Sequence, residues 1–160
     1  MRNLILPIII LLASCNTNPN SKNLQGQIDS LNSKVHNAYQ PGFGEFMSNI
    51  QLHHAKLWFA GINNNWRLAD YEVHEMQEAL VSIQKYNKDR PESQIIDVLY
   101  PSIDSINAAI AQKNPQFFKS SYELLTRTCN DCHKSTAHDF NVITIPTTPP
   151  ISNQDFKVVQ

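Results

Sequence analysis

Cys129, Cys132 and His133 belong to a C-x-x-C-H run, Cys-Asn-Asp-Cys-His, near the end of the chain. Two thiols at this spacing can add to the two vinyl groups on one edge of a porphyrin. The adjacent imidazole can then bind the iron. The run therefore predicts covalent attachment of one c-type haem through Cys129 and Cys132, with His133 as the proximal iron ligand.

Three other uses of these cysteines are alternatives to haem attachment. A structural zinc site needs a second Cys/His pair, and the only other cysteine is the distant Cys15. A thioredoxin-type redox pair would lie beside a βαβ pattern, which the sequence lacks. A disulfide between Cys129 and Cys132 remains open, but haem attachment is favoured.

The first residues have the pattern of an export signal. Arg2 is positive, Leu4 to Leu12 is an apolar run, and small residues precede Cys15. The apolar run has about half of the roughly 20 residues that a membrane-spanning helix needs. Residues 12–15, Leu-Ala-Ser-Cys, resemble the lipobox of bacterial lipoprotein precursors. That resemblance implies a signal peptide over residues 1–14 and a lipid anchor on Cys15.

The rest of the chain suits one domain with a polar leader. We expect residues 15–40 to hold the lipidated cysteine, a flexible tether over 16–26 and a short helix over 27–39. The net charge of −1 gives no electrostatic case for binding nucleic acid.

Apolar residues at helical spacing predict four longer helices. Pro101 predicts a kink or a fresh helix start, and Asn114-Pro115 is a good helix start. The Pro-rich segment after about residue 137 excludes a helix. The predicted helices cover residues 42–61, 66–86, 92–112 and 114–137.

These helices predict an all-α fold, an antiparallel four-helix bundle over residues 41–137. A short helix precedes the bundle, and an extended Pro-rich tail, residues 138–160, packs on it. In such a bundle the first helix begins at the pole where the fourth helix ends. The haem cysteines would therefore lie at that pole.

A four-helix bundle with C-x-x-C-H near the end of its last helix resembles the cytochrome c-prime class, including low-spin relatives of the cytochrome c-556 type. Residues 53–61, 65–72 and 147–150 also resemble segments of small exported bacterial cytochromes. The resemblance covers about residues 40–155, and only the haem motif is highly specific. It implies haem insertion outside the inner membrane and dimerisation through helix faces in some relatives.

The second iron ligand is open among three alternatives. Met47 lies about as far from the start of the first helix as His133 lies from the end of the fourth, so the two levels coincide. A thioether is a suitable axial ligand and raises the reduction potential. Met47 is therefore preferred, while His54 and an open distal site remain alternatives.

Other residues receive structural interpretations. Met76 is expected in the core, and His53 is expected in solvent. The aromatic residues Trp58, Trp66 and Tyr71 are expected to close the far pole. Three cations near the haem pole could pair with the haem propionates, and four residues of the second helix are expected to form a solvated face. These are Lys88, Arg90 and Lys134, and then Glu72, His74, Glu75 and Glu78.

The sequence therefore predicts a lipid-anchored monohaem c-type cytochrome on the periplasmic side of a bacterial membrane. It would transfer single electrons between redox proteins of the envelope, and no residue set suggests catalysis. The alternative is a gas-binding haem protein with an open distal iron face. The oligomeric state stays open, and a homodimer is one of the alternatives.

Overall fold

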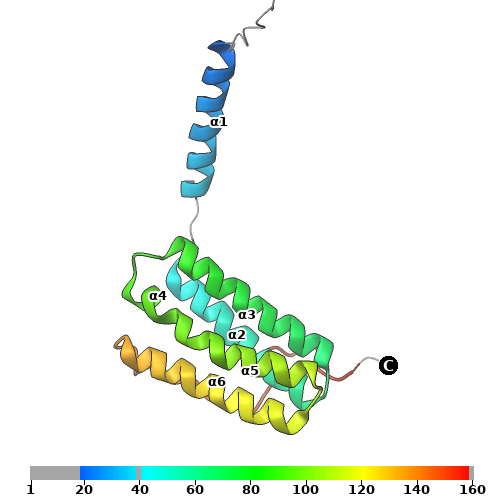
Figure 1. Cartoon of the computed structure of the whole chain (residues 1–160). Coiled ribbons are helices and arrows are strands. Elements are labelled where there is room, and N and C mark those ends of the chain that lie inside the picture. The colour runs from blue at the N-terminus through cyan, green and yellow to red at the C-terminus, as the bar shows by residue number, and fades with distance from the viewer. Residues whose placement is uncertain (1–18, 39–40, 159–160) are drawn as a thin grey trace, which may run out of the picture. The chain divides into compact units, whose positions relative to one another are not determined.

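The computed structural model describes residues 19–38 and 41–158 (Figure 1). All regular structure within these residues is helical, as the sequence predicts. The chain divides into two units, residues 1–40 and 41–160. The predicted signal peptide and Cys15 lie outside the described residues. None of the described helices is long and apolar enough to cross a membrane.

The first unit contains helix α1, Pro19–Ala38. The prediction of a flexible tether over residues 16–26 is therefore wrong from Pro19 onward. Side-chain bonds between residues four apart join Gln25 to Asp29 and Gln27 to Asn23. Such pairs support a helix in a segment whose polar composition alone suggests disorder.

Helices α2 (Phe43–Ile62) and α3 (Trp66–Tyr86) follow the predicted ranges within one residue. The turn between them contains Asn64 in the left-handed region, at φ 57°. The Asn65 side chain accepts a hydrogen bond from the Leu68 backbone N–H and caps α3.

The third predicted helix is divided into three pieces. These are α4 (Pro91–Ile95), the 3₁₀-helix η1 (Ile96–Leu99) and α5 (Tyr100–Ala111). Pro101 lies at the start of α5, as predicted. A proline ring clashes with the carbonyl four residues earlier and donates no hydrogen bond, so the preceding turn cannot continue as α-helix.

Helix α6 covers Pro115–Ser135. The Asn114 side chain accepts hydrogen bonds from the backbone N–H groups of Gln116 and Phe117, which confirms the predicted helix start. Residues 138–158 contain neither helix nor strand. Within this segment, Phe156 is buried against the ring of Phe59 in α2.

Helices α2, α3, α5 and α6 lie alongside one another in the second unit, and the colours in Figure 1 show that α2 and α5 run opposite to α3 and α6. Contacts join α2 to α3, α5 to α6, α3 to α5 and α2 to α6. Met76 is 1 % exposed in the core that they enclose, as predicted. The largest other side chains of this core are Leu57, Leu80, Ile83, Ile96, Ile103, Ile106, Phe118, Tyr122 and Leu125.

The aromatic cluster differs from the prediction in one member. Trp58 and Trp66 pack against Phe118, with ring centroids 6.4 and 6.0 Å away. Tyr122 joins them from α6, 4.9 Å from Trp58. Tyr71 is 51 % exposed and is not part of the cluster. The prediction therefore named too few of the aromatic residues that pack between α2 and α6.

Two expectations of solvated residues are wrong, because His53 and Glu72 are both buried between α2 and α3. His53 Nδ1 lies 2.6 Å from Glu72 Oε2. Lys56 Nζ lies 3.1 Å from Glu72 Oε1, as an ion pair without hydrogen-bond geometry. A buried carboxylate needs such cationic or hydrogen-bonding partners. The partners come from the neighbouring helix, so helical periodicity within α3 does not reveal them.

Candidate cofactor site

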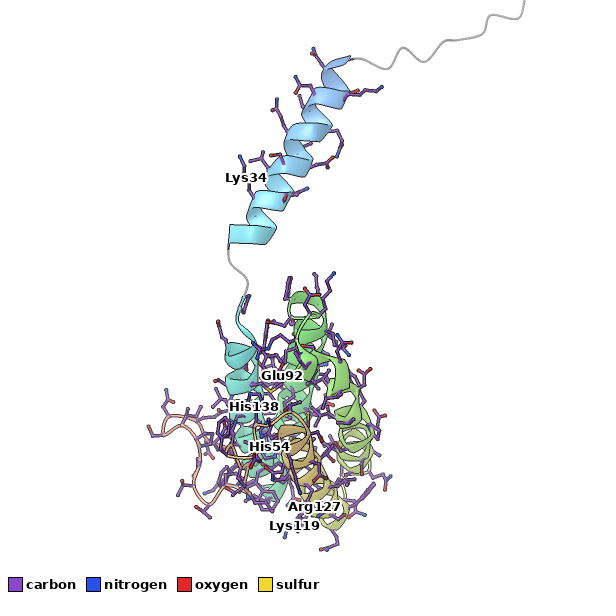
Figure 2. All side chains as sticks on the ribbon, turned by 90° about the vertical axis from the view of Figure 1, so that its left-hand side faces the viewer. Lys34, His54, Glu92, Lys119, Arg127 and His138 are labelled. Atoms are coloured by element: carbon purple, nitrogen blue, oxygen red, sulfur yellow. The ribbon has the colours of Figure 1, made fainter. Side chains whose placement is uncertain are left out.

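A cavity of about 300 Å³ opens at the end of the second unit where α2 begins and α6 ends. Figure 2 looks onto this end of the helices and labels three lining residues, His54, Glu92 and His138. They come from α2, from α4 and from the segment after α6. Apolar side chains of α2 and of η1 add to the lining, namely Phe43, Met47, Ile50, Ile96 and Leu99.

The three residues of the C-x-x-C-H run that carry chemistry all line this cavity. Cys129 and Cys132 are three positions apart on α6, so their side chains share one face of the helix. Both thiols are free and half-buried. Burial raises the pKa of Cys129 to about 12 and also raises the pKa of Cys132. Both thiols therefore keep their protons at neutral pH.

The His133 imidazole is oriented by the segment that follows α6. Its Nδ1 lies 2.6 Å from the backbone oxygen of Asn141. A carbonyl oxygen can only accept, so Nδ1 carries the hydrogen and donates it. The lone pair is then on Nε2, which is the arrangement that metal-binding histidines adopt when a carbonyl fixes their tautomer.

Asn130 holds this segment in place from inside the motif. Its side-chain N–H donates to the Ile143 backbone oxygen at 2.9 Å, and its side-chain oxygen accepts from the Ile143 N–H at 2.8 Å. This two-bond clasp lies two residues beyond Asn141. The sequence alone indicates no role for Asn130, although an asparagine can both donate and accept toward one backbone unit.

Met47 is half-buried in α2 and lines the same cavity as His133. The structure therefore brings together the two residues that the sequence pairs as iron ligands. Met76, the other internal methionine, does not line the cavity. A flexible, polarisable thioether suits either an apolar wall or a soft metal ligand.

His54 also lines the cavity, but both of its ring nitrogens have partners within the protein. The Thr126 hydroxyl donates to the Tyr122 carbonyl at 2.9 Å, so its oxygen accepts from His54 Nε2–H at 3.0 Å. The Tyr122 hydroxyl lies 3.0 Å from His54 Nδ1. Burial lowers the pKa of His54 to about 4, so the ring is neutral near neutral pH. Binding of His54 to a metal would have to break one of these buried bonds.

A charged cluster lines the cavity beside these groups. Arg90 donates two hydrogen bonds to Glu92, from Nε at 3.1 Å and from Nη2 at 2.8 Å. Its guanidinium also lies 4.9 Å from the centroid of the Phe43 ring. The Arg90 hydrogen bonds hold the pKa of Glu92 below its usual range. His138 Nε2 lies 3.9 Å from Glu92.

Of the three cations proposed for the propionates, only Arg90 lines the cavity. Lys88 and Lys134 do not line the cavity, although both are close in sequence to residues that do. Because Arg90 is already paired with Glu92, any negative group on a cofactor would have to share this guanidinium. Arg90 still has N–H donors beyond the two that Glu92 takes.

The residues present fit a haem. Two thiols and one imidazole of fixed tautomer line one wall of the cavity, and the Met47 thioether lines the same cavity. The remaining lining is largely apolar. No group of three or more His, Cys, Asp or Glu side chains among the described residues could hold a metal ion by itself. A haem iron takes only its axial ligands from the protein, so it requires no such group.

The chain matches no protein-family model, and no characterised protein or solved structure is significantly similar to it.

Proposed function

We propose that this protein is a c-type cytochrome that carries one covalently bound haem and transfers single electrons in the cell envelope. One observation carries the proposal. Cys129, Cys132, His133 and Met47 line a single cavity, and a backbone carbonyl fixes the tautomer of His133. The thiols are the groups that c-type attachment requires, and the imidazole and thioether suit the iron.

The finer fold belongs to the same proposal. Helices α2, α3, α5 and α6 form an antiparallel four-helix bundle, and the Pro-rich segment after α6 is a tail that packs on it. The order of the helices and the position of the motif near the end of α6 resemble the cytochrome c-prime class and its cytochrome c-556-like relatives. The alternating chain directions in Figure 1 and the contact of Phe156 with Phe59 support this assignment.

A bound haem would supply reversible one-electron oxidation and reduction. The chain's own residues would hold and insulate it. Cys129 and Cys132 would attach it, His133 Nε2 would bind one iron face, and Met47 would bind the other. The apolar lining from Phe43, Ile50, Ile96 and Leu99 excludes water, which keeps the environment similar in both oxidation states.

The location follows from the N-terminal sequence. We propose cleavage before Cys15, lipid on that cysteine, and residence on the periplasmic side of a bacterial membrane. Redox proteins of the envelope would be the partners, nucleic acid would not, and the protein would act as a carrier and not as an enzyme. The haem proposal supports this location, since the resemblance implies haem insertion outside the inner membrane.

Two matched substitutions test the role of Met47. Met47→Leu and Met76→Leu make the same chemical change, but only Met47 lines the cavity. We expect Met47→Leu to convert a low-spin haem to a high-spin form that binds CO, since leucine keeps the volume but cannot bind iron. Met76→Leu should leave the spectrum low-spin and insensitive to CO. The measurement is absorption of the reduced protein with and without CO.

The outcomes separate the candidate functions. A low-spin spectrum in Met47→Leu would remove Met47 from the iron. A high-spin, CO-binding spectrum in the unsubstituted protein would contradict the electron-carrier proposal and favour a gas-binding protein with an open distal face.

A further inference from the structure

Helix α1 presents a continuous aliphatic stripe on an otherwise polar helix. Leu24, Ile28, Leu31 and Val35 are 61, 44, 59 and 72 % exposed. Their neighbours on the helix are asparagine, glutamine, serine, lysine, glycine and aspartate. Scattered exposed aliphatic residues are ordinary, but an aligned row of four on one helix marks a contact surface.

The spacing of the four residues is that of a coiled-coil seam. The steps along the chain are four, three and four, which places Leu24 and Leu31 at d positions and Ile28 and Val35 at a positions of a heptad. β-branched residues at a with leucine at d are the combination that favours parallel two-stranded pairing. The stripe is confined to a and d, which is narrower than the apolar face of a helix that packs on a globular core.

The positions beside the seam permit pairing with an identical helix. Gln25 and Asn32 occupy e positions, and Gln27 and Lys34 occupy g positions. In a parallel pair, Gln27 of one copy would face Asn32 of the other, so no like charges meet there. The remaining charges of the described side chains, Lys22 and Asp29, fall at b positions, away from the seam.

Energetics also favour a partner for α1. An isolated helix of this length is marginal in water, and Gly26 costs about 1 kcal/mol relative to alanine in a helix interior. Pairing would cover four aliphatic side chains per copy. A membrane surface is a poorer occupant, because α1 has no Phe, Trp or Tyr and has only two lysines, Lys22 and Lys34.

We propose that α1 is a dimerisation helix that pairs in parallel with α1 of a second copy of this chain. Parallel pairing leaves both N-termini at the same end, which suits two chains attached to one membrane. The proposal depends on neither the haem nor the lipid. Its consequence would be a complex with two copies of the cofactor site, which increases the avidity for a partner that offers two docking sites.

Photocrosslinking of the full chain in intact cells tests the proposal. A benzophenone amino acid replaces Ile28, at the centre of the seam, or Ser30, at a c position on the outer face. We expect illumination to convert the Ile28-substituted chain to a species of twice its mass, with the crosslink mapped to residues 24–31 of the second copy. The Ser30-substituted chain should still pair, but illumination should give no species of twice its mass.

A pair of charge variants supplies a matched control. Leu24→Lys with Leu31→Lys, and Asn23→Lys with Ser30→Lys, add the same charge at the same spacing one residue apart. With benzophenone at position 28, the seam variant should lose the dimer band and the outer-face variant should keep it. Crosslinks from position 28 to lipid, to a different protein or to residues 41–158 of the same chain would overturn the proposal, as would no crosslink at all.

Discussion

His54 and His133 both line the candidate cofactor cavity, but their ring nitrogens contact different groups. His133 has Nδ1 fixed by the Asn141 carbonyl, and among the described residues none bonds to its Nε2. His54 has both nitrogens engaged, by Thr126 and Tyr122. The proposed iron ligand is therefore distinguished from a structural histidine by its hydrogen bonds and not by its residue type.

The separation along the sequence between contacting residues explains which single-residue roles could be predicted. Cys129, Cys132 and His133 lie within five consecutive residues, so their spacing alone predicts haem attachment. The partners of His54 are 72 and 68 residues away in the sequence. Glu72 and His53 are 19 residues apart. No local pattern encodes contacts at such separations, so the burial of His53, His54 and Glu72 needed the structure.

Burial of neutral His54 predicts a stability loss in acid. Its pKa is about 4 in the folded protein and about 6.5 when unfolded. The unfolded chain therefore takes up a proton first as the pH falls. This contribution to stability is complete above pH 6.5 and is lost between pH 6.5 and 4, with a magnitude of about 3 kcal/mol.

The measurement is urea unfolding of the full chain between pH 7.5 and 4. We expect His54→Gln to flatten the dependence of the unfolding free energy on pH. The exposed His74, replaced by Gln, serves as the matched control and should keep the original slope. Equal slopes in the original protein and in His54→Gln would show that His54 is not buried in its neutral form.

At the scale of helices, boundaries were predicted best where a capping residue or proline specifies them. Asn114 with Pro115 marks a predicted helix start that the structure confirms. Asn65 caps α3 in the structure, whereas from the sequence the asparagine run was expected only to end the preceding helix. For the 3₁₀ turn at Ile96–Leu99, the sequence predicted only a kink or a fresh helix start at Pro101. The start of α1 at Pro19 was not predicted. The polar composition of this segment is typical of disorder, and it conceals the bonds between residues four apart that support the helix.

Close packing of α2 on α6 predicts a strong effect at Gly61. A Cβ on Gly61 would lie 2.0 Å from a ring carbon of Phe118. That ring is fully buried and packs against the rings of Trp58, Trp66 and Tyr122. Gly61→Ala should therefore destabilise the protein by about 1–3 kcal/mol, despite the better helix propensity of alanine.

Chemical denaturation of a double-mutant cycle checks this contact. Phe118→Leu removes the ring whose carbons meet the new Cβ, so Gly61→Ala should cost less in the Phe118→Leu background than alone. A Gly61→Ala protein as stable as the original, or strictly additive costs in the cycle, would contradict the packing.

At the scale of the whole molecule, the candidate cofactor site depends on chain segments from both ends of the second unit. Met47 comes from the first helix of this unit, His133 from its last, and Asn141 from the segment beyond. Alternating helix directions bring these parts together, and the Asn130 clasp fixes the final segment. The sequence predicted the meeting of Met47 and His133 from helix lengths, but not the clasp, because the last segment has no periodic pattern.

Haem attachment is tested most directly by the mass of one peptide. Trypsin cleaves after Arg127 and Lys134, so digestion releases residues 128–134 with both cysteines and His133. The full chain is produced in a bacterial host that attaches c-type haem, and the peptide mass is measured after digestion in denaturant. We expect residues 128–134 to carry the added mass of one haem. The bare peptide, or one lighter by the two hydrogens of a disulfide, would contradict the proposed cytochrome.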